Sequence, residues 1–188
     1  MQRLSLATLQ RTGAQAMPPM PALAHTSWRW GFAALIVALL AQTTVLHGFT
    51  VRGGTISFAF LVVLWFATGA GTARGAFFGL IAGALEDAVS GASGVAWTFA
   101  TPIAAAAAAR IVTATGWDHP LFLGLVAAVA VALRSIVFWL VLRAEQPLVA
   151  LDSHAVHAAL WSVALDALAV VLATSAFRRL RPQRVNRR

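Results

Sequence analysis

The stretch at residues 120–142, PLFLGLVAAVAVALRSIVFWLVL, decides the fold class of this chain. Arg134 is its only charged residue, and most of its other side chains are aliphatic or aromatic. A helix needs about 20 apolar residues to cross the hydrocarbon core of a bilayer. Residues 120–142 therefore predict a transmembrane helix.

The rest of the chain has the same apolar character. Of its 188 residues, 60% are hydrophobic and 11% are charged, whereas an average soluble domain has about 25% charged residues. Further apolar runs, separated by turns rich in glycine, proline or arginine, lie at residues 30–49, 55–70, 75–89, 95–115 and 155–177. Together they predict an all-α polytopic membrane protein, a bundle of about six transmembrane helices.

The arginines predict how this bundle is oriented. If both termini are cytoplasmic, the arginines on the cytoplasmic side are Arg3, Arg11, Arg29, Arg74, Arg110, Arg178, Arg179, Arg181, Arg184, Arg187 and Arg188. Arg52 and Arg143 then lie outside, and Arg134 lies within the fifth span. Because cytoplasmic loops carry an excess of arginine, we expect both termini in the cytoplasm and the protein in the bacterial inner membrane.

The chain divides into three predicted segments. Residues 1–27 are expected to form a flexible cytoplasmic tail, residues 28–177 the transmembrane domain, and residues 178–188 an arginine-rich cytoplasmic tail. The basic tail is expected to bind anionic membrane lipid, at about 1 kcal/mol per arginine near the surface. Membrane topology explains the arginines, so no nucleic-acid partner is predicted despite a pI of about 12.0.

Small and amide side chains predict close contacts between helices. Gly75, Gly79 and Gly83 recur every four residues and would form a smooth face against which a neighbouring helix can pack. Gln42 lies inside the first span, where a hydrogen bond to another helix is a more common role than ligand binding.

Two acidic residues, Glu86 and Asp87, end the third predicted span. One or both are expected to reach the outer interface and be solvated. Asp87 is expected to cap the turn at Ser90 and Gly91, or to accept hydrogen bonds from backbone amides of the next helix. A proton or cation site is the open alternative, because acidic groups inside membranes are costly and often functional.

Arg134 and Asp166 are predicted to form a buried ion pair. Counted along the fifth and sixth spans at about 1.5 Å per residue, they lie roughly 13 and 16 Å from the outer boundary. Adjacent antiparallel helices would therefore bring them level. A pair that fixes helix register is the favoured interpretation, and a part in a transport path is the alternative.

No catalytic or cofactor site is predicted. His47, His119, His154 and His157 lie near the ends of spans without a third ligand at metal spacing, so we interpret them as interfacial and expect no metal. The chain has no cysteine and no HExxH, P-loop or GxGxxG motif. Asp87 and Asp166 lie at different depths, which argues against an intramembrane aspartyl protease. We therefore expect a protein that is not an enzyme.

Three stretches resemble the MreD family of rod-shape-determining membrane proteins. The sequence LAQTT at residues 40–44 is similar to the family's leucine-rich helix with a glutamine. Residues 79–91, GLIAGALEDAVSG, followed by Gly94, are similar to its glycine-containing helix that ends in Asp and then Ser-Gly. The last span leads into a basic terminus, FRRL at residues 177–180. Glu86 and Asp166 depart from the pattern, since an apolar residue and Asn are usual there.

This resemblance, which covers about residues 30–181, implies a non-enzymatic scaffold of the cell-elongation complex. Such proteins bind the bitopic protein MreC and help couple MreB filaments to peptidoglycan synthesis by RodA and a class B penicillin-binding transpeptidase. The residues that we expect to serve structure or partner binding are Gln42, Gly75, Gly79, Gly83, Asp87, Ser90, Gly91, Gly94, Arg134 and Asp166.

The main alternative is a substrate-binding membrane subunit of a vitamin-type transporter. Six-helix proteins of that kind have a similar size and hydropathy, and they need a polar pocket near the outer face. Glu86, Asp87, Trp97 and Arg143 are the residues expected to line such a pocket. An intramembrane enzyme is the third and least favoured possibility.

Overall fold

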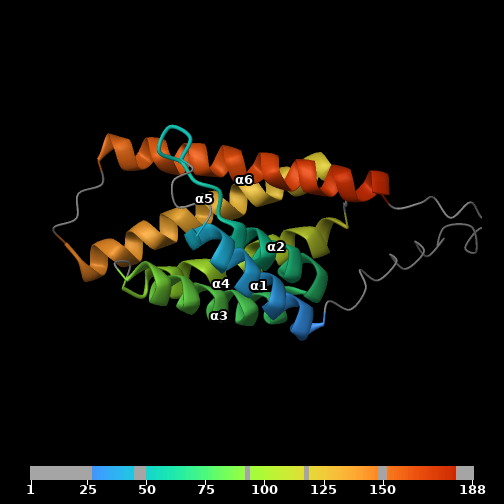
Figure 1. Cartoon of the computed structure of the whole chain (residues 1–188), viewed down its shortest axis with the longest axis horizontal. Coiled ribbons are helices and arrows are strands. Elements are labelled where there is room, and N and C mark those ends of the chain that lie inside the picture. The colour runs from blue at the N-terminus through green and yellow to red at the C-terminus, as the bar shows by residue number, and fades with distance from the viewer. Residues whose placement is uncertain (1–26, 45–49, 92–93, 117–118, 148–151, 181–188) are drawn as a thin grey trace, which may run out of the picture.

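The computed structural model describes residues 27–44, 50–91, 94–116, 119–147 and 152–180. They form six helices: α1 (Trp28–Thr44), α2 (Phe58–Ala70), α3 (Thr72–Ser90), α4 (Ala96–Thr115), α5 (Pro120–Glu145) and α6 (Ser153–Leu180) (Figure 1). These ranges contain no β-strand, only an isolated bridge between Val51 and Gly54. The all-α class and the order of six helices are confirmed. Most of both predicted tails lies outside the described residues, and α6 continues past the predicted boundary at residue 177.

Local chemistry sets several helix ends. Helix α2 begins at Phe58 rather than at residue 55, because the Ser57 side chain caps it by accepting from the backbone N–H of Phe60. Pro120 occupies the first turn of α5, as its position in the sequence predicts. Gly91 ends α3 with a φ of 64°, in the left-handed region that glycine tolerates best.

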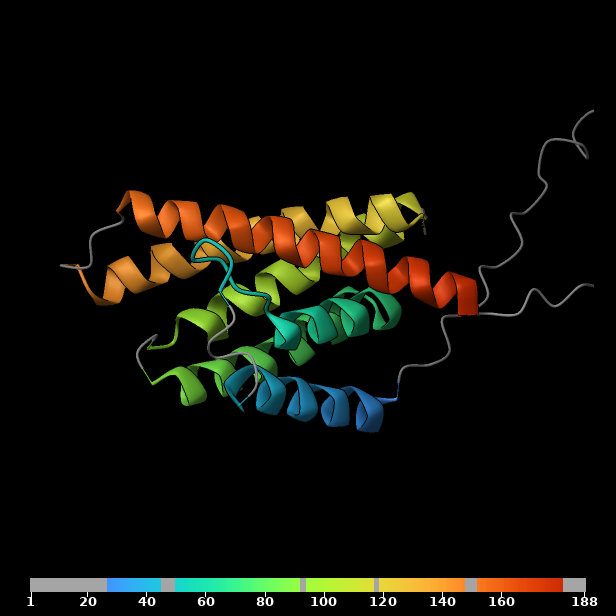
Figure 2. The same ribbon diagram turned by 45° about the horizontal axis from the view of Figure 1, so that its top comes forward.

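The helices pack in a chain of neighbours around a central pair. Helices α3 and α4 pack against each other, and α2 contacts both of them. Helix α1 packs on α2, whereas α5 lies between α4 and α6. Figure 2 shows α1 and α6 at opposite edges of the bundle.

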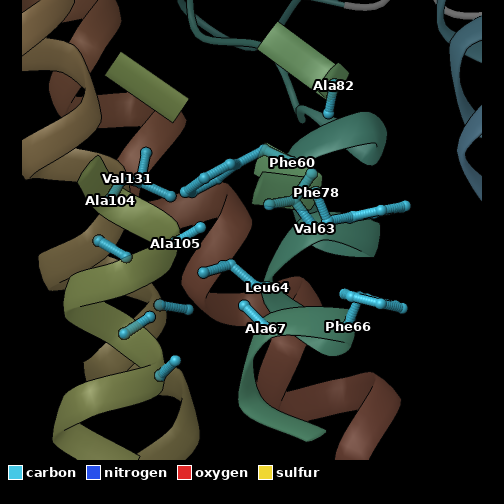
Figure 3. Close-up of a cluster of buried hydrophobic side chains, with 14 of the residues drawn as sticks. Phe60, Val63, Leu64, Phe66, Ala67, Phe78, Ala82, Ala104, Ala105 and Val131 are labelled. Carbon is cyan, nitrogen blue, oxygen red and sulfur yellow. The ribbon is translucent and has the colours of Figure 1, made fainter. Parts of the chain in front are cut away.

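The buried core joins α2 to α4 and α5. Phe60, Val63 and Phe66 of α2 are fully buried and belong to one cluster with alanines of α4 and Val131 of α5. Figure 3 shows the Phe60 side chain extending toward Val131, whereas Phe66 points to the other side of α2. At one end of the core Phe66 stacks on Phe78 of α3, with ring centroids 4.2 Å apart. Small alanines opposite large aromatic rings allow this close packing of helices.

The predicted glycine face is confirmed, and it packs against helices of this same chain. A Cβ atom added to Gly75 would lie 2.6 Å from the Cβ of Ala67 on α2, and one added to Gly79 would lie 3.0 Å from the Cα of Pro102 on α4. At Gly83 an added Cβ would overlap the backbone carbonyl of Trp97. The three glycines therefore let α3 approach both α2 and α4.

We expect Gly83→Ala to lower the free energy of unfolding by about 1–3 kcal/mol, because backbone atoms of α4 must move away from the added methyl group. Thermal unfolding of the detergent-solubilised chain would measure this loss. Ala84→Leu adds more volume on the exposed side of the same helix and should change stability little. Equal effects of the two substitutions would contradict close packing at Gly83.

Among the residues that the structure describes, two helices are long and apolar enough to cross a membrane: α5, and residues Ser153–Phe177 of α6. Of the most apolar window of α6, only 6% is buried within the chain. Large apolar side chains such as Leu125, Leu140, Leu160 and Leu172 point outward from these two helices and are more than half exposed. Their lengths and apolar surfaces agree with a membrane protein.

Candidate functional site

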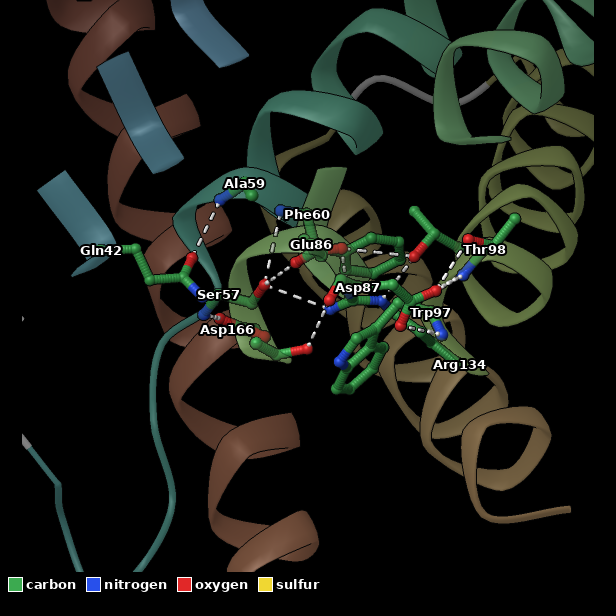
Figure 4. Close-up of polar contacts among 12 residues, drawn as sticks. Gln42, Ser57, Ala59, Phe60, Glu86, Asp87, Trp97, Thr98, Arg134 and Asp166 are labelled. Carbon is green, nitrogen blue, oxygen red and sulfur yellow. Dashed lines mark hydrogen bonds and ion pairs between the residues drawn. The ribbon is translucent and has the colours of Figure 1, made fainter. Parts of the chain in front are cut away.

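Arg134 of α5 is the centre of a buried polar network (Figure 4). Its guanidinium forms an ion pair with Glu86 of α3. It also donates from Nε to the Thr101 hydroxyl at 3.1 Å and from Nη1 to the Ser57 hydroxyl at 3.1 Å. One arginine thus joins α3, α4 and the residue that caps α2, and each nitrogen of the guanidinium has an acceptor.

Aromatic rings cover the faces of the same guanidinium. Its central carbon lies 4.1 Å from the ring centroid of Trp97 and 4.5 Å from that of Phe60. Such cation–π contacts stabilise a positive charge by about 2 kcal/mol or more where water is excluded. The rings therefore help to compensate for the burial of a charged group.

The predicted ion pair between Arg134 and Asp166 is wrong: Arg134 pairs with Glu86 instead. Asp166 accepts a hydrogen bond from the backbone N–H of Ser57 at 3.0 Å, and Arg134 is close enough to act on it electrostatically. The positions of Arg134 and Asp166 along their helices do place Asp166 at the same site. However, Gly83 allows α3 to pack closely against α4, and the Glu86 side chain then reaches the guanidinium.

The expectation that Glu86 is solvated at an interface is also wrong. Its exposed fraction is 7%, and its carboxylate contacts Thr101 and Ser57 as well as the arginine. Helix α3 continues to Ser90, so Glu86 lies one turn before its end and α4 covers it. Residue spacing alone gave no sign of this covering helix.

Asp87 has one of its two predicted roles. Its carboxylate accepts from the backbone N–H groups of Trp97 at 3.1 Å and Thr98 at 2.7 Å, and from the Thr98 hydroxyl at 2.7 Å. These amides belong to the first turn of α4, where backbone donors have no partner inside the helix. Asp87 therefore fixes the start of α4 against the end of α3.

The other residues of the MreD-like stretch shape the connection between α3 and α4. The Ser90 hydroxyl donates to the carbonyl of Asp87 at 3.2 Å. Gly91 and Gly94 have positive φ angles of 64° and 59°, which favour glycine. A Cβ atom on Gly94 would also overlap the Glu145 carboxylate.

Gln42 links α1 to the start of α2, as predicted for a residue that joins helices. Its side-chain oxygen accepts from the backbone N–H of Ala59 at 3.4 Å. Ser57 and Thr101, which complete the network around Arg134, were not predicted from the sequence. One signal for Thr101 was available: it is a polar residue in the apolar run that precedes the alanines of α4.

The network lies at the wall of a cavity of about 810 Å³. Glu86, Arg134 and Asp166 all contact this cavity, together with the aromatic residues Trp97, Phe138 and Trp139. Its other lining residues are Leu39, Gln42, Thr43, Thr55, Ser57, Val89, Ser90, Val131, Ser135, Ala155, Ala158, Ala159 and Ser162. Of the four residues expected to line a polar pocket, Glu86 and Trp97 do so and Asp87 and Arg143 do not.

His119 and His157 form hydrogen bonds with neighbouring residues of α5 and α6. His119 caps α5 by accepting from the backbone N–H of Leu121 at 3.3 Å, and His157 accepts from the indole N–H of Trp161 at 3.0 Å. His47 lies outside the described residues. In the part of the chain that the structure describes, no group of three His, Cys, Asp or Glu side chains is placed to hold a metal ion.

Comparison with known proteins gives no match: no family model, curated protein or solved structure matches this chain.

Proposed function

We propose that this chain is a non-enzymatic scaffold of the bacterial cell-elongation complex, similar in role to MreD. It spans the inner membrane six times with both termini in the cytoplasm. It binds an MreC-like bitopic protein and helps couple MreB filaments to wall synthesis by RodA and a class B transpeptidase. The MreD-like stretch supports the choice of family, since its Asp87, Ser90 and Gly91 hold the α3–α4 connection.

The exposed apolar surface of α6 is the observation that supports a partner helix in the membrane. Helix α6 packs on α5, but its most apolar window is only 6% buried. Leu168 and Leu172 point away from the chain, with exposed fractions of 54% and 61%. A single helix of a bitopic protein would pack along this surface through van der Waals contacts, the main force between helices in lipid.

Affinity purification of the tagged full-length chain from mild-detergent membranes tests this proposal. Mass spectrometry should find an MreC-like bitopic protein, with or without RodA and its transpeptidase. Recovery of an ATPase and a coupling subunit would overturn the scaffold and favour the vitamin-type transporter subunit. The cavity beside Glu86 and Trp97 gives that second candidate its structural support.

We expect the double variant Leu168→Ala/Leu172→Ala to reduce recovery of the bitopic partner at least fivefold while the chain still folds. The matched control is Leu121→Ala/Leu125→Ala on α5, whose leucines are 66% and 61% exposed. Quantitative mass spectrometry of the purified complexes measures both effects. Unchanged recovery with the α6 variant would place the partner on another surface.

A further inference from the structure

We propose that the cavity beside Glu86, Arg134 and Asp166 binds an ammonium group that is attached to an apolar body. The scaffold role does not require this site, and the inference does not depend on that role. A volume of about 810 Å³ is within the range of about 300–1,000 Å³ that is typical of small-molecule sites. Its lining residues come from α1, α3, α4, α5 and α6, together with Thr55 and Ser57 before α2.

The charges that line the cavity favour a cation. Two carboxyl groups, those of Glu86 and Asp166, contact the cavity, but only one guanidinium, that of Arg134, does so, and it pairs with Glu86. Both carboxylates are buried, with exposed fractions of 7% and 1% for their residues. An uncompensated charge in such a place is costly, and a bound ammonium group would compensate it.

The same contacts disfavour an anion. The nitrogens of Arg134 already donate to Glu86, Thr101 and Ser57. Rings of Phe60 and Trp97 lie over the guanidinium. An anionic ligand would have to break these contacts while it approached two carboxylates.

Aromatic residues provide a surface for the apolar body of the ligand. The rings of Trp97 and Phe138 stack with centroids 4.0 Å apart, and Trp139 also lines the cavity. An ammonium group near Asp166 and an apolar part against Phe138 and Trp139 would use both features.

Two sources carry this chemistry: a free amine, or the head group of phosphatidylethanolamine. The first probe is phenethylammonium chloride, with neutral 2-phenylethanol as the matched control. Quenching of tryptophan fluorescence in the detergent-solubilised full-length chain measures binding. We expect saturable binding of the amine that is at least tenfold tighter than binding of the alcohol. The second probe is native mass spectrometry after reconstitution with equal amounts of phosphatidylethanolamine and phosphatidylglycerol.

Variants connect the binding to this cavity. Asp166→Asn should weaken amine binding at least tenfold, whereas Asp152→Asn, the same change on an exposed residue before α6, should not. Ala159→Leu enlarges a side chain that lines the cavity without removing a charge. It should abolish binding, so the test does not depend on how well Asp166→Asn folds. Selective retention of phosphatidylethanolamine that Ala159→Leu abolishes would identify the lipid as the source, and amine binding alone would identify a free amine. Equal binding of amine and alcohol without lipid selectivity, or binding that survives Ala159→Leu, would overturn the proposal.

Discussion

Arg134→Met is expected to destabilise the chain by about 3–5 kcal/mol, which is the usual cost of leaving one partner of a buried ion pair without the other. The substitution leaves the Glu86 carboxylate buried beside Thr101 and Ser57 without its cation. It also removes the contacts of the guanidinium with Phe60 and Trp97. Thermal or denaturant unfolding of the purified protein in detergent measures the change.

A second substitution distinguishes the loss of the pair from the loss of volume. Arg134→Met/Glu86→Gln removes both charges and should recover most of the lost stability, because replacing both members of a buried pair is often nearly neutral. Arg143→Met, at an exposed position on the same helix, is the control and should have little effect. If the double variant were as unstable as Arg134→Met, the ion pair would not be the cause.

Asp87→Ala is the second substitution with a large expected effect, a loss of about 4–5 kcal/mol of stability, because each hydrogen bond to a charged group contributes roughly 1.5 kcal/mol or more. Three donors at the start of α4 would lose their acceptor. Asp87→Asn keeps one oxygen acceptor and should lose about half as much, since a neutral acceptor makes weaker hydrogen bonds. The same unfolding measurement applies.

The control for Asp87 is an exposed helix cap in the same protein. Asp152 accepts from the backbone N–H of Ala155 at 2.8 Å at the start of α6, and Asp152→Ala should cost about 1 kcal/mol, as is typical for such caps. If Asp87→Ala cost no more than this, its bonds to Trp97 and Thr98 would act as an ordinary cap. The connection between α3 and α4 would then need another explanation.

Structural features that depend on residues close together in the sequence could be predicted from the sequence. The apolar runs, the glycine spacing and Pro120 gave the number and order of the helices, because helix formation and termination are local. The link from Asp87 to α4 was also within reach, since only a short connection separates Asp87 from Trp97 and Thr98. That the helices cross a membrane six times stays a prediction.

The contacts of the candidate site could be predicted from the sequence only in part. The depths counted along α5 and α6 correctly predicted that Arg134 and Asp166 lie at one site, and both line the same cavity. The same depths predicted the wrong ion-pair partner for Arg134. Depth measures position along a helix axis and says nothing about which side of the helix faces which neighbour. Ser57 and Thr101 were missed for the same reason.

The sequence by itself determined that this is an all-helical protein with apolar outer surfaces, since residue type and spacing set both properties. Only the tertiary structure decided that Glu86 pairs with Arg134, that Asp166 binds the backbone of Ser57, and that these residues share one cavity. The physical reason is contact between residues far apart in the chain, such as Glu86 of α3 and Arg134 of α5. Gly83 sets the distance between α3 and α4, and that distance places the Glu86 carboxylate at the guanidinium.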